Sequence, residues 1–261
     1  MKIIVCVKQV PDTNEVKIDP VKGTLIRDGI PSILNPDDAN ALEEALALKD
    51  KYTDVKVTVL TMGPPQAEEI LRECLAMGAD DVILLSDRAF AGADTWATSN
   101  TIAAAIRKIG EYDIVFAGRQ AIDGDTAQVG PQIAERIGIP QVSYVQNFKI
   151  DGDEIIVQRQ LEDGHEVIKV KKPVLLTAIK ELNEPRYISM KGIFNAYKKS
   201  ITTWTLSDLD IEKHQVGLDA SPTNVLRSFT PEPKGKGIII KGTVEEMVEK
   251  LVVNLSKKNV I

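Results

Sequence analysis

The segment 118–130 has the residue types that suit a bound anion. It follows a predicted strand and leads into a predicted helix, so free backbone amides at the helix N-terminus can face a negative charge. Gly118, Gly124 and Gly130 permit tight turns and close backbone approach, and Thr126 adds a hydroxyl donor. The spacing matches neither the dinucleotide-binding glycine fingerprint nor a P-loop. On spacing alone, a plain strand–turn–helix connection is favoured.

Two carboxylates in this segment, Asp123 and Asp125, would repel a phosphate that they faced. We therefore expect them to cap the following helix or to accept hydrogen bonds from the loop's own amides. The stretch 92–99 is also rich in small and hydroxyl-bearing residues, which suits a ligand lying over backbone. Its alternative is an ordinary helix cap made by Asp94 or Thr95.

The elements that position these loops alternate along the first two-thirds of the chain. Predicted strands cover 2–7, 55–62, 81–85 and 113–117, and predicted helices cover 38–51, 65–77, 94–109 and 126–137. This order predicts an α/β fold with a Rossmann-like, mostly parallel sheet and helices on both faces. Right-handed crossovers place the strand-to-helix loops at one sheet edge, where open sheets bind ligands, so a nucleotide cleft is expected there.

The pattern changes after about residue 141. Further strands are predicted over 145–150, 154–160, 166–170 and 174–178, with a hairpin at Asp151-Gly152-Asp153. We assign residues 1–220 to one nucleotide-binding domain and 221–261 to a C-terminal arm that ends in a helix over 243–255. The apolar stripe of that helix suits packing on a partner subunit, and packing on its own core is equally expected from the pattern.

The composition excludes several classes of function. A formal net charge of −6 and 5% aromatic residues argue against a nucleic-acid partner. The apolar runs are of strand length and no secretory signal is recognised, so we expect no membrane partner and a cytoplasmic location. Two distant cysteines and two histidines in charged surroundings give no metal site and no catalytic constellation. A cofactor is therefore expected to carry the chemistry.

Several separated segments resemble the beta subunits of electron-transfer flavoproteins, and together they cover essentially the whole chain. They are 6–12, 35–36, 76–80, 157–177 and 182–190, the last similar to the family's LNEPRY segment. The resemblance implies a heterodimer with an alpha subunit that carries one FAD. The beta-subunit cleft holds AMP in the housekeeping members, and a second FAD that meets NADH in the electron-bifurcating members. The nucleotide contacts expected from the resemblance and from the loops are Cys6, Asn35, Asp38, Met62, Gly63, Asp94, Thr95, Thr98, Gly118, Gln120, Asp123, Gly124, Asp125, Thr126, Ala127, Gln128 and Val129.

Segments 86–99 and 123–131 resemble those of the bifurcating subgroup. Small Gly124 and Ala127 would leave room for a diphosphate and a flavin, whereas this loop is bulkier in the AMP-type members. The resemblance then implies a subunit that takes two electrons from NADH. One goes to ferredoxin or flavodoxin, and the other passes through the alpha-subunit FAD to a flavin dehydrogenase of the acyl-CoA or lactate type. Two alternatives stay open: a non-bifurcating electron carrier with AMP in the cleft, and a stand-alone nucleotide-binding protein of related fold.

Residues around 182–201 resemble the segment with which these beta subunits dock dehydrogenases. The resemblance implies docking through Arg186, Tyr187 and Met190, with Met190 as the apolar anchor. The alternative is a surface turn with one exposed methionine. Tyr197 stands where family members often carry lysine, so the identity of the partner is left open.

Overall fold

A computed structural model describes residues 1–12, 31–226 and 235–261. The first two of these ranges belong to one compact unit and the third belongs to another. The strands are β1 (Lys2–Val7), β2 (Gln9–Pro11), β3 (Ser32–Leu34), β4 (Lys56–Met62), β5 (Asp81–Leu85), β6 (Ile114–Gly118), β7 (Gln141–Asp151), β8 (Glu154–Leu161), β9 (Gly164–Lys171), β10 (Val174–Ala178) and β11 (Thr202–Trp204). The α-helices are α1 (Pro36–Lys51), α2 (Glu68–Met77), α3 (Thr95–Ile109), α4 (Val129–Ile137), α5 (Met190–Ala196) and α6 (Val244–Lys257).

Nine strands form one sheet in the order β11-β5-β4-β1-β6-β10-β7-β8-β9. The strands from β11 to β7 are parallel to their neighbours, whereas β7, β8 and β9 pair in antiparallel fashion. The short strands β2 and β3 form a separate antiparallel pair. The predicted α/β class, with a mostly parallel sheet, is therefore confirmed, and the antiparallel strands extend the same sheet.

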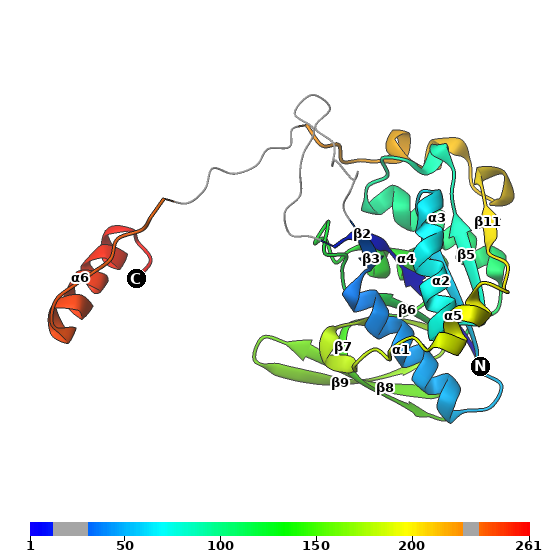
Figure 1. Cartoon of the computed structure of the whole chain (residues 1–261), viewed down its shortest axis with the longest axis horizontal. Helices are drawn as coiled ribbons and strands as arrows, with labels where there is room; N and C mark the ends of the chain where they lie inside the picture. The colour runs from blue at the N-terminus through cyan, green and yellow to red at the C-terminus, as the bar shows by residue number, and fades with distance from the viewer. Residues whose placement is uncertain (13–30, 227–234) are drawn as a thin grey trace. The chain divides into compact units, whose positions relative to one another are not determined.

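Helices cover both faces of the parallel part of the sheet (Figure 1). Side chains of Ile3, Val5 and Val7 pack in one apolar cluster with α1 and α2. Ile4 and Cys6 face the opposite way and pack with α3 and α4. Because successive residues of a strand alternate between faces, a central strand buried on both sides needs a continuous apolar run.

The predicted helix over 126–137 is the clearest difference in this unit. The helix α4 begins only at Val129, because Asp125 and Ala127 have φ values of 47° and 51°. Such left-handed residues cannot continue a right-handed helix. The helix ends follow the prediction better, since α2, α3 and α4 end at Gly78, Gly110 and Gly138, all with positive φ.

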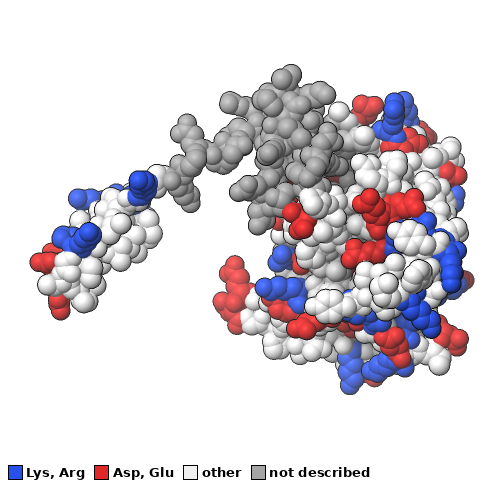
Figure 2. Space-filling view, in the orientation of Figure 1, with Lys and Arg blue, Asp and Glu red and all other residues white. Residues whose placement is uncertain are grey.

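The other unit contains α6, whose predicted start is confirmed. Thr243 and Glu246 form a reciprocal capping box at its N-terminus. Val244, Val248, Leu251 and Val252 on this helix are exposed, and Figure 2 shows an uncharged face of the helix beside a charged one. Within the described ranges, no helix combines the length and apolar character needed to cross a membrane.

Candidate functional site

The chain changes direction across the sheet between β1 and β6. From β1 it moves through β4 to β5 on one side, and it returns to β6 on the other side of β1. The loops after β1 and β6 therefore lead away from each other, which makes this a topological switch point. Open α/β sheets bind ligands in the crevice between two such loops. Lys8, directly after β1, and the segment 119–128 flank it. The predicted edge of the sheet and the switch point thus coincide.

Asn35 holds the loop after β6 in place. Its side chain is fully buried, its Nδ2 donates to the carbonyl of Gln120 at 2.8 Å, and its Oδ1 accepts from the amide of Ile122 at 3.1 Å. Its own backbone amide donates to the carbonyl of Lys8 at 3.0 Å. Asn35 therefore ties both flanking loops together, and its role as a nucleotide contact stays a prediction.

Asp38, in the first turn of α1, joins the ends of the same two strands. One carboxylate oxygen accepts from the amide of Lys8 at 2.8 Å, and the other accepts from the amide of Gly118 at 2.9 Å. Burial raises the pKa of Asp38 to about 7, in spite of hydrogen bonds that favour the charged form. Like Asn35, this side chain holds the backbone of the segments that flank the cleft. A direct contact of Asp38 with a nucleotide stays a prediction.

Gly118 is required by the close approach of α1 to the end of β6. A Cβ atom at this position would lie 2.2 Å from Asp38 Oδ1 and 2.8 Å from the backbone of Asp37. The close approach predicted for this glycine is therefore real, and it is an approach of one protein segment to another. At Gly130 a Cβ atom would lie 2.7 Å from Thr177 Cγ2. The absence of a side chain at Gly130 therefore allows α4 to pack tightly on the sheet.

The two carboxylates of the loop have side-chain partners. Asp123 accepts from Lys8 Nζ at 2.6 and 2.8 Å, and Asp125 accepts from Gln120 Nε2 at 2.8 Å. The expectation that they cap the helix or bond the loop's amides is therefore wrong. The helix α4 begins only at Val129, and the two carboxylates accept hydrogen bonds from the side chains of Lys8 and Gln120 instead. The left-handed residues Asp125 and Ala127 are of the kind found in anion-binding backbone nests.

The loop before α3 forms a rim of this region beside the segment after β6. Asp94 caps α3, accepting from the amide of Ala97 at 3.0 Å, which confirms the capping alternative. Desolvation acts to raise the pKa of Asp94, but hydrogen bonds from Ala97 and Thr223 outweigh it and the pKa is lowered. Thr95 Oγ1 donates to Gln128 Oε1 at 3.0 Å, so this rim touches the segment after β6.

The remaining predicted contacts lie at the same edge or just below it. Met62 is half-buried at the end of β4, the Gly63 amide donates to the carbonyl of Leu85 at 3.1 Å, and Thr98 is half-buried on α3. Cys6 is buried, and burial followed by the nearby Asp38 raises the pKa of its thiol to about 12. A raised pKa disfavours the thiolate, which is the nucleophilic form of cysteine.

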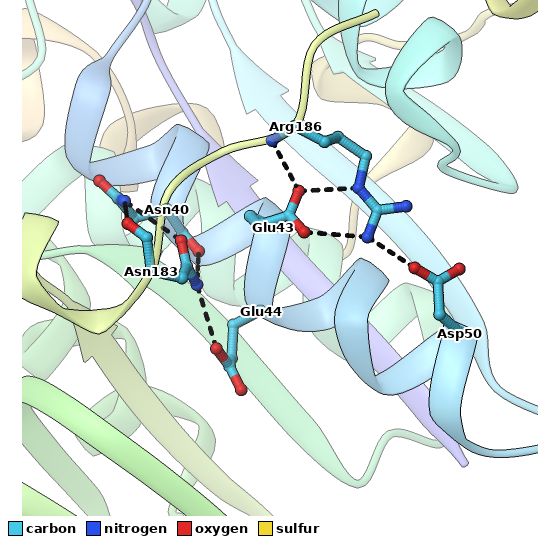
Figure 3. Close-up of polar contacts among 6 residues, drawn as sticks. All are labelled: Asn40, Glu43, Glu44, Asp50, Asn183 and Arg186. Carbon is cyan, nitrogen blue, oxygen red and sulfur yellow. Dashed lines mark hydrogen bonds and ion pairs between the residues drawn. The ribbon is translucent and has the colours of Figure 1, made fainter.

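Arg186 lies against α1 in an intramolecular cluster, which Figure 3 shows. Its Nε and Nη2 donate to the two carboxylate oxygens of Glu43 at 2.8 and 2.9 Å, and Nη2 also donates to Asp50 at 2.7 Å. Its backbone amide donates to Glu43 as well, at 3.0 Å. The guanidinium group that was predicted to contact a partner therefore anchors the segment 182–190 to α1. Docking of a partner through Arg186 stays a prediction.

A second pair of side chains fastens the start of the same segment (Figure 3). Asn40 Nδ2 donates to the carbonyl of Asn183 at 2.7 Å, and Asn183 Nδ2 donates to Glu44 at 3.0 Å. The pKa of Glu44 is raised, because its desolvation by burial outweighs the hydrogen bond from Asn183. The helix α1 thus carries the segment after η3 (Lys180–Leu182) on one side and the cleft loops at its N-terminus.

Beyond this anchor the segment presents apolar side chains to solvent. Tyr187 is 100% exposed and Met190 is 69% exposed, and Phe194 and Tyr197 on or beside α5 are also exposed. A Cβ atom at Gly192 would lie 2.2 Å from the carbonyl oxygen of Ala76, so α5 rests directly on the end of α2. An exposed apolar surface on a fixed support suits a protein interface. Sequence reasoning missed Phe194, because a single aromatic in a seven-residue helix carries no periodic pattern.

Comparison with known proteins gives consistent matches. A family model described as the electron transfer flavoprotein domain matches residues 22–209. A protein of Acetobacterium woodii named caffeyl-CoA reductase-Etf complex subunit CarD is 61% identical over 262 residues, and the match covers 100% of both chains. An electron transfer flavoprotein subunit beta of Clostridium acetobutylicum is also 61% identical, over 261 residues and 100% of both chains. An acryloyl-CoA reductase electron transfer subunit gamma of Anaerotignum propionicum is 52% identical over 269 residues, again with 100% of both chains covered.

Proposed function

Because the chain belongs to the family of electron-transfer flavoprotein beta subunits, we propose that it binds FAD in the cleft between β1 and β6 and acts with an alpha subunit in electron bifurcation. In this proposal two electrons come from NADH. One passes to ferredoxin or flavodoxin, and the other passes through the alpha-subunit flavin to a partner flavin dehydrogenase or reductase.

The observation that carries the proposal is the segment after β6 at the switch point. A Cβ atom at Gly124 would meet no heavy atom within 4 Å, so the turn has space beside it. Asp123 is paired with Lys8, whose positive charge offsets that of the carboxylate, and Asp125 is bonded to Gln120. Together with the left-handed Asp125 and Ala127, this favours a diphosphate lying along the segment.

The chain's own residues supply position and solvent exclusion rather than acid–base chemistry. Asn35 and Asp38 fix the backbone of both flanking loops, and the buried thiol of Cys6 lies near Asp38. Bound FAD would supply the one- and two-electron chemistry. The Thr95–Gln128 contact joins the two rims that the flavin nucleotide would lie between.

The proposed partners follow from two exposed surfaces and from the relatives. The arm ending in α6 carries exposed Val248, Leu251 and Val252, and we propose that it packs on the alpha subunit. The surface of Tyr187, Met190 and Phe194 would meet the acceptor enzyme. The relatives named for caffeyl-CoA and acryloyl-CoA reductases favour a CoA-thioester oxidoreductase in that role.

The function is tested with the chain co-expressed with its alpha subunit and mixed with a CoA-thioester reductase, an enoyl-CoA and ferredoxin. NADH should reduce ferredoxin only while the enoyl-CoA is also being reduced, with one ferredoxin electron for each electron passed to the reductase. Reduction of the enoyl-CoA without any ferredoxin reduction would favour the AMP-containing electron carrier. The third alternative, a stand-alone nucleotide-binding protein, does not explain matches that span the full chain.

A further inference from the structure

The two loops that flank the switch point are joined by one ion pair. Lys8 Nζ donates to both carboxylate oxygens of Asp123, at 2.6 and 2.8 Å. The Asp123 side chain is 14% exposed, whereas the Lys8 side chain is 46% exposed. The carboxylate is therefore largely enclosed, and the ammonium group reaches it from the solvent side of the crevice. A lysine in this setting can be approached by a second anion.

The backbone around Lys8 does not depend on this ion pair. The Lys8 amide donates to Asp38 at 2.8 Å, and its carbonyl accepts from the amide of Asn35 at 3.0 Å. Asn35 also holds residues 120 and 122 of the facing loop. Since both loops are already fastened, the flexible four-carbon stem of Lys8 can redirect its charge without moving the strands.

Among the described residues that flank the crevice (8–12, 31–35 and 119–128), the other cation, Arg119, is committed elsewhere. Arg119 Nε lies 3.3 Å from Asp37, and its guanidinium lies over the ring of Tyr144 at 5.9 Å from the centroid. Of these two cations, Lys8 is therefore the better placed to meet a phosphate that follows the 119–128 segment. An ammonium group binds phosphate as a point charge with several rotatable donors.

We propose that Lys8 binds a phosphate of the nucleotide in this cleft and that Asp123 competes with the phosphate for its ammonium group. The inference rests on the proposed function. Lys8 contributes attraction to the phosphate, and Asp123 contributes both repulsion and a rival partner. The two members of one ion pair therefore act on nucleotide affinity with opposite signs. A purely structural ion pair has no such asymmetry, because breaking it from either side removes the same contact.

The test uses the complex with the alpha subunit, freed of nucleotide by dialysis against high salt, and equilibrium dialysis with AMP and with adenosine. Lys8→Gln should weaken AMP binding by about tenfold, as loss of one charge-assisted contact implies. Asp123→Asn should tighten AMP binding. Adenosine has no phosphate, so its affinity should stay the same in both variants. A thermal melt of each variant shows whether it is folded.

The outcomes separate the possibilities. If both substitutions weaken AMP and adenosine binding alike, the pair is structural and the proposal for Lys8 is overturned. If Lys8→Gln leaves AMP affinity unchanged, Lys8 does not meet the phosphate. A wild-type complex that binds neither AMP nor FAD would instead contradict the proposed cleft itself, and with it the role of Lys8.

Discussion

Replacing Gly118 with alanine is expected to lower the free energy of unfolding by about 1–3 kcal/mol, the range for inserting an atom into filled space, and to abolish nucleotide retention. The new Cβ would lie 2.2 Å from Asp38 Oδ1 and 2.8 Å from the backbone amide nitrogen of Asp38. Since the neighbouring backbone cannot yield as a flexible side chain does, α1 must move away from β6. That movement breaks the carboxylate contact which joins the ends of β1 and β6.

The matched control is Gly124→Ala in the same segment. A Cβ atom there meets no heavy atom within 4 Å, and the φ angle of Gly124 is not positive. Chemical denaturation should give this control the stability of the wild type. Gly124 is a control for stability alone, because it is itself an expected nucleotide contact. The FAD and AMP content of the Gly118 variant after gel filtration, compared with that of the wild type, reports retention. Equal stability of the Gly118 and Gly124 variants would contradict the role given to the α1–β6 contact.

Arg186→Gln is expected to release the segment 182–190 from α1 and to weaken docking of the partner enzyme. Glu43, whose side chain is 12% exposed, would lose two charged hydrogen-bond donors. Leaving a largely buried acceptor unsatisfied lowers the free energy of unfolding by about 1–3 kcal/mol. Hydrogen exchange should accelerate over 182–190, and affinity for the CoA-thioester reductase should fall. Nucleotide content should stay at the wild-type level, because Arg186 makes its contacts with α1 residues after the cleft turn.

Asp50→Asn is the control for this variant. The Asp50 side chain is 65% exposed, and exposed ion pairs contribute only about 0–1 kcal/mol. Its stability and exchange should stay close to those of the wild type. An Arg186→Gln protein with unchanged stability and exchange but lost partner binding would show that Arg186 is a direct contact rather than an anchor.

The regular elements of the sheet could be predicted because they are long and periodic. The strands β1, β4, β5 and β6 are apolar on both faces, and the glycines after α2, α3 and α4 mark their ends. The short elements β2, β3 and β11 have three residues each and give no period to detect. The late start of α4 depends on the left-handed conformation of Asp125 and Ala127. The types of these two residues do not predict that conformation.

The sequence predicted which loops meet at one edge of the sheet, but it did not predict the hydrogen-bond partners of their side chains. Asn35, Asp38 and Gly118 come together as expected, since they stand at the ends of neighbouring elements. Their hydrogen bonds go to the protein backbone, which no local pattern reveals. The role proposed for Lys8 was not predicted, although the sequence has a cation directly after the first strand. Its partner Asp123 is 115 residues away, and only the sheet order brings the two together.

The helix α1 is common to both proposed surfaces. Its N-terminal turn holds the cleft loops through Asp38, and the next turns hold the docking segment through Asn40, Glu43 and Glu44. The two sets of contacts use different residues, so each can be removed separately. The Gly118 and Arg186 variants are therefore expected to lose different properties, nucleotide retention in one case and partner binding in the other.

The most direct test of FAD binding in this chain is the cofactor content of the complex with its alpha subunit. The purified complex is denatured, and released FAD and AMP are quantified by chromatography against standards. Two FAD and no AMP per heterodimer is the expected result, because the proposed function assigns one flavin to each subunit. One FAD with one AMP would contradict bifurcation and leave a single-flavin electron carrier.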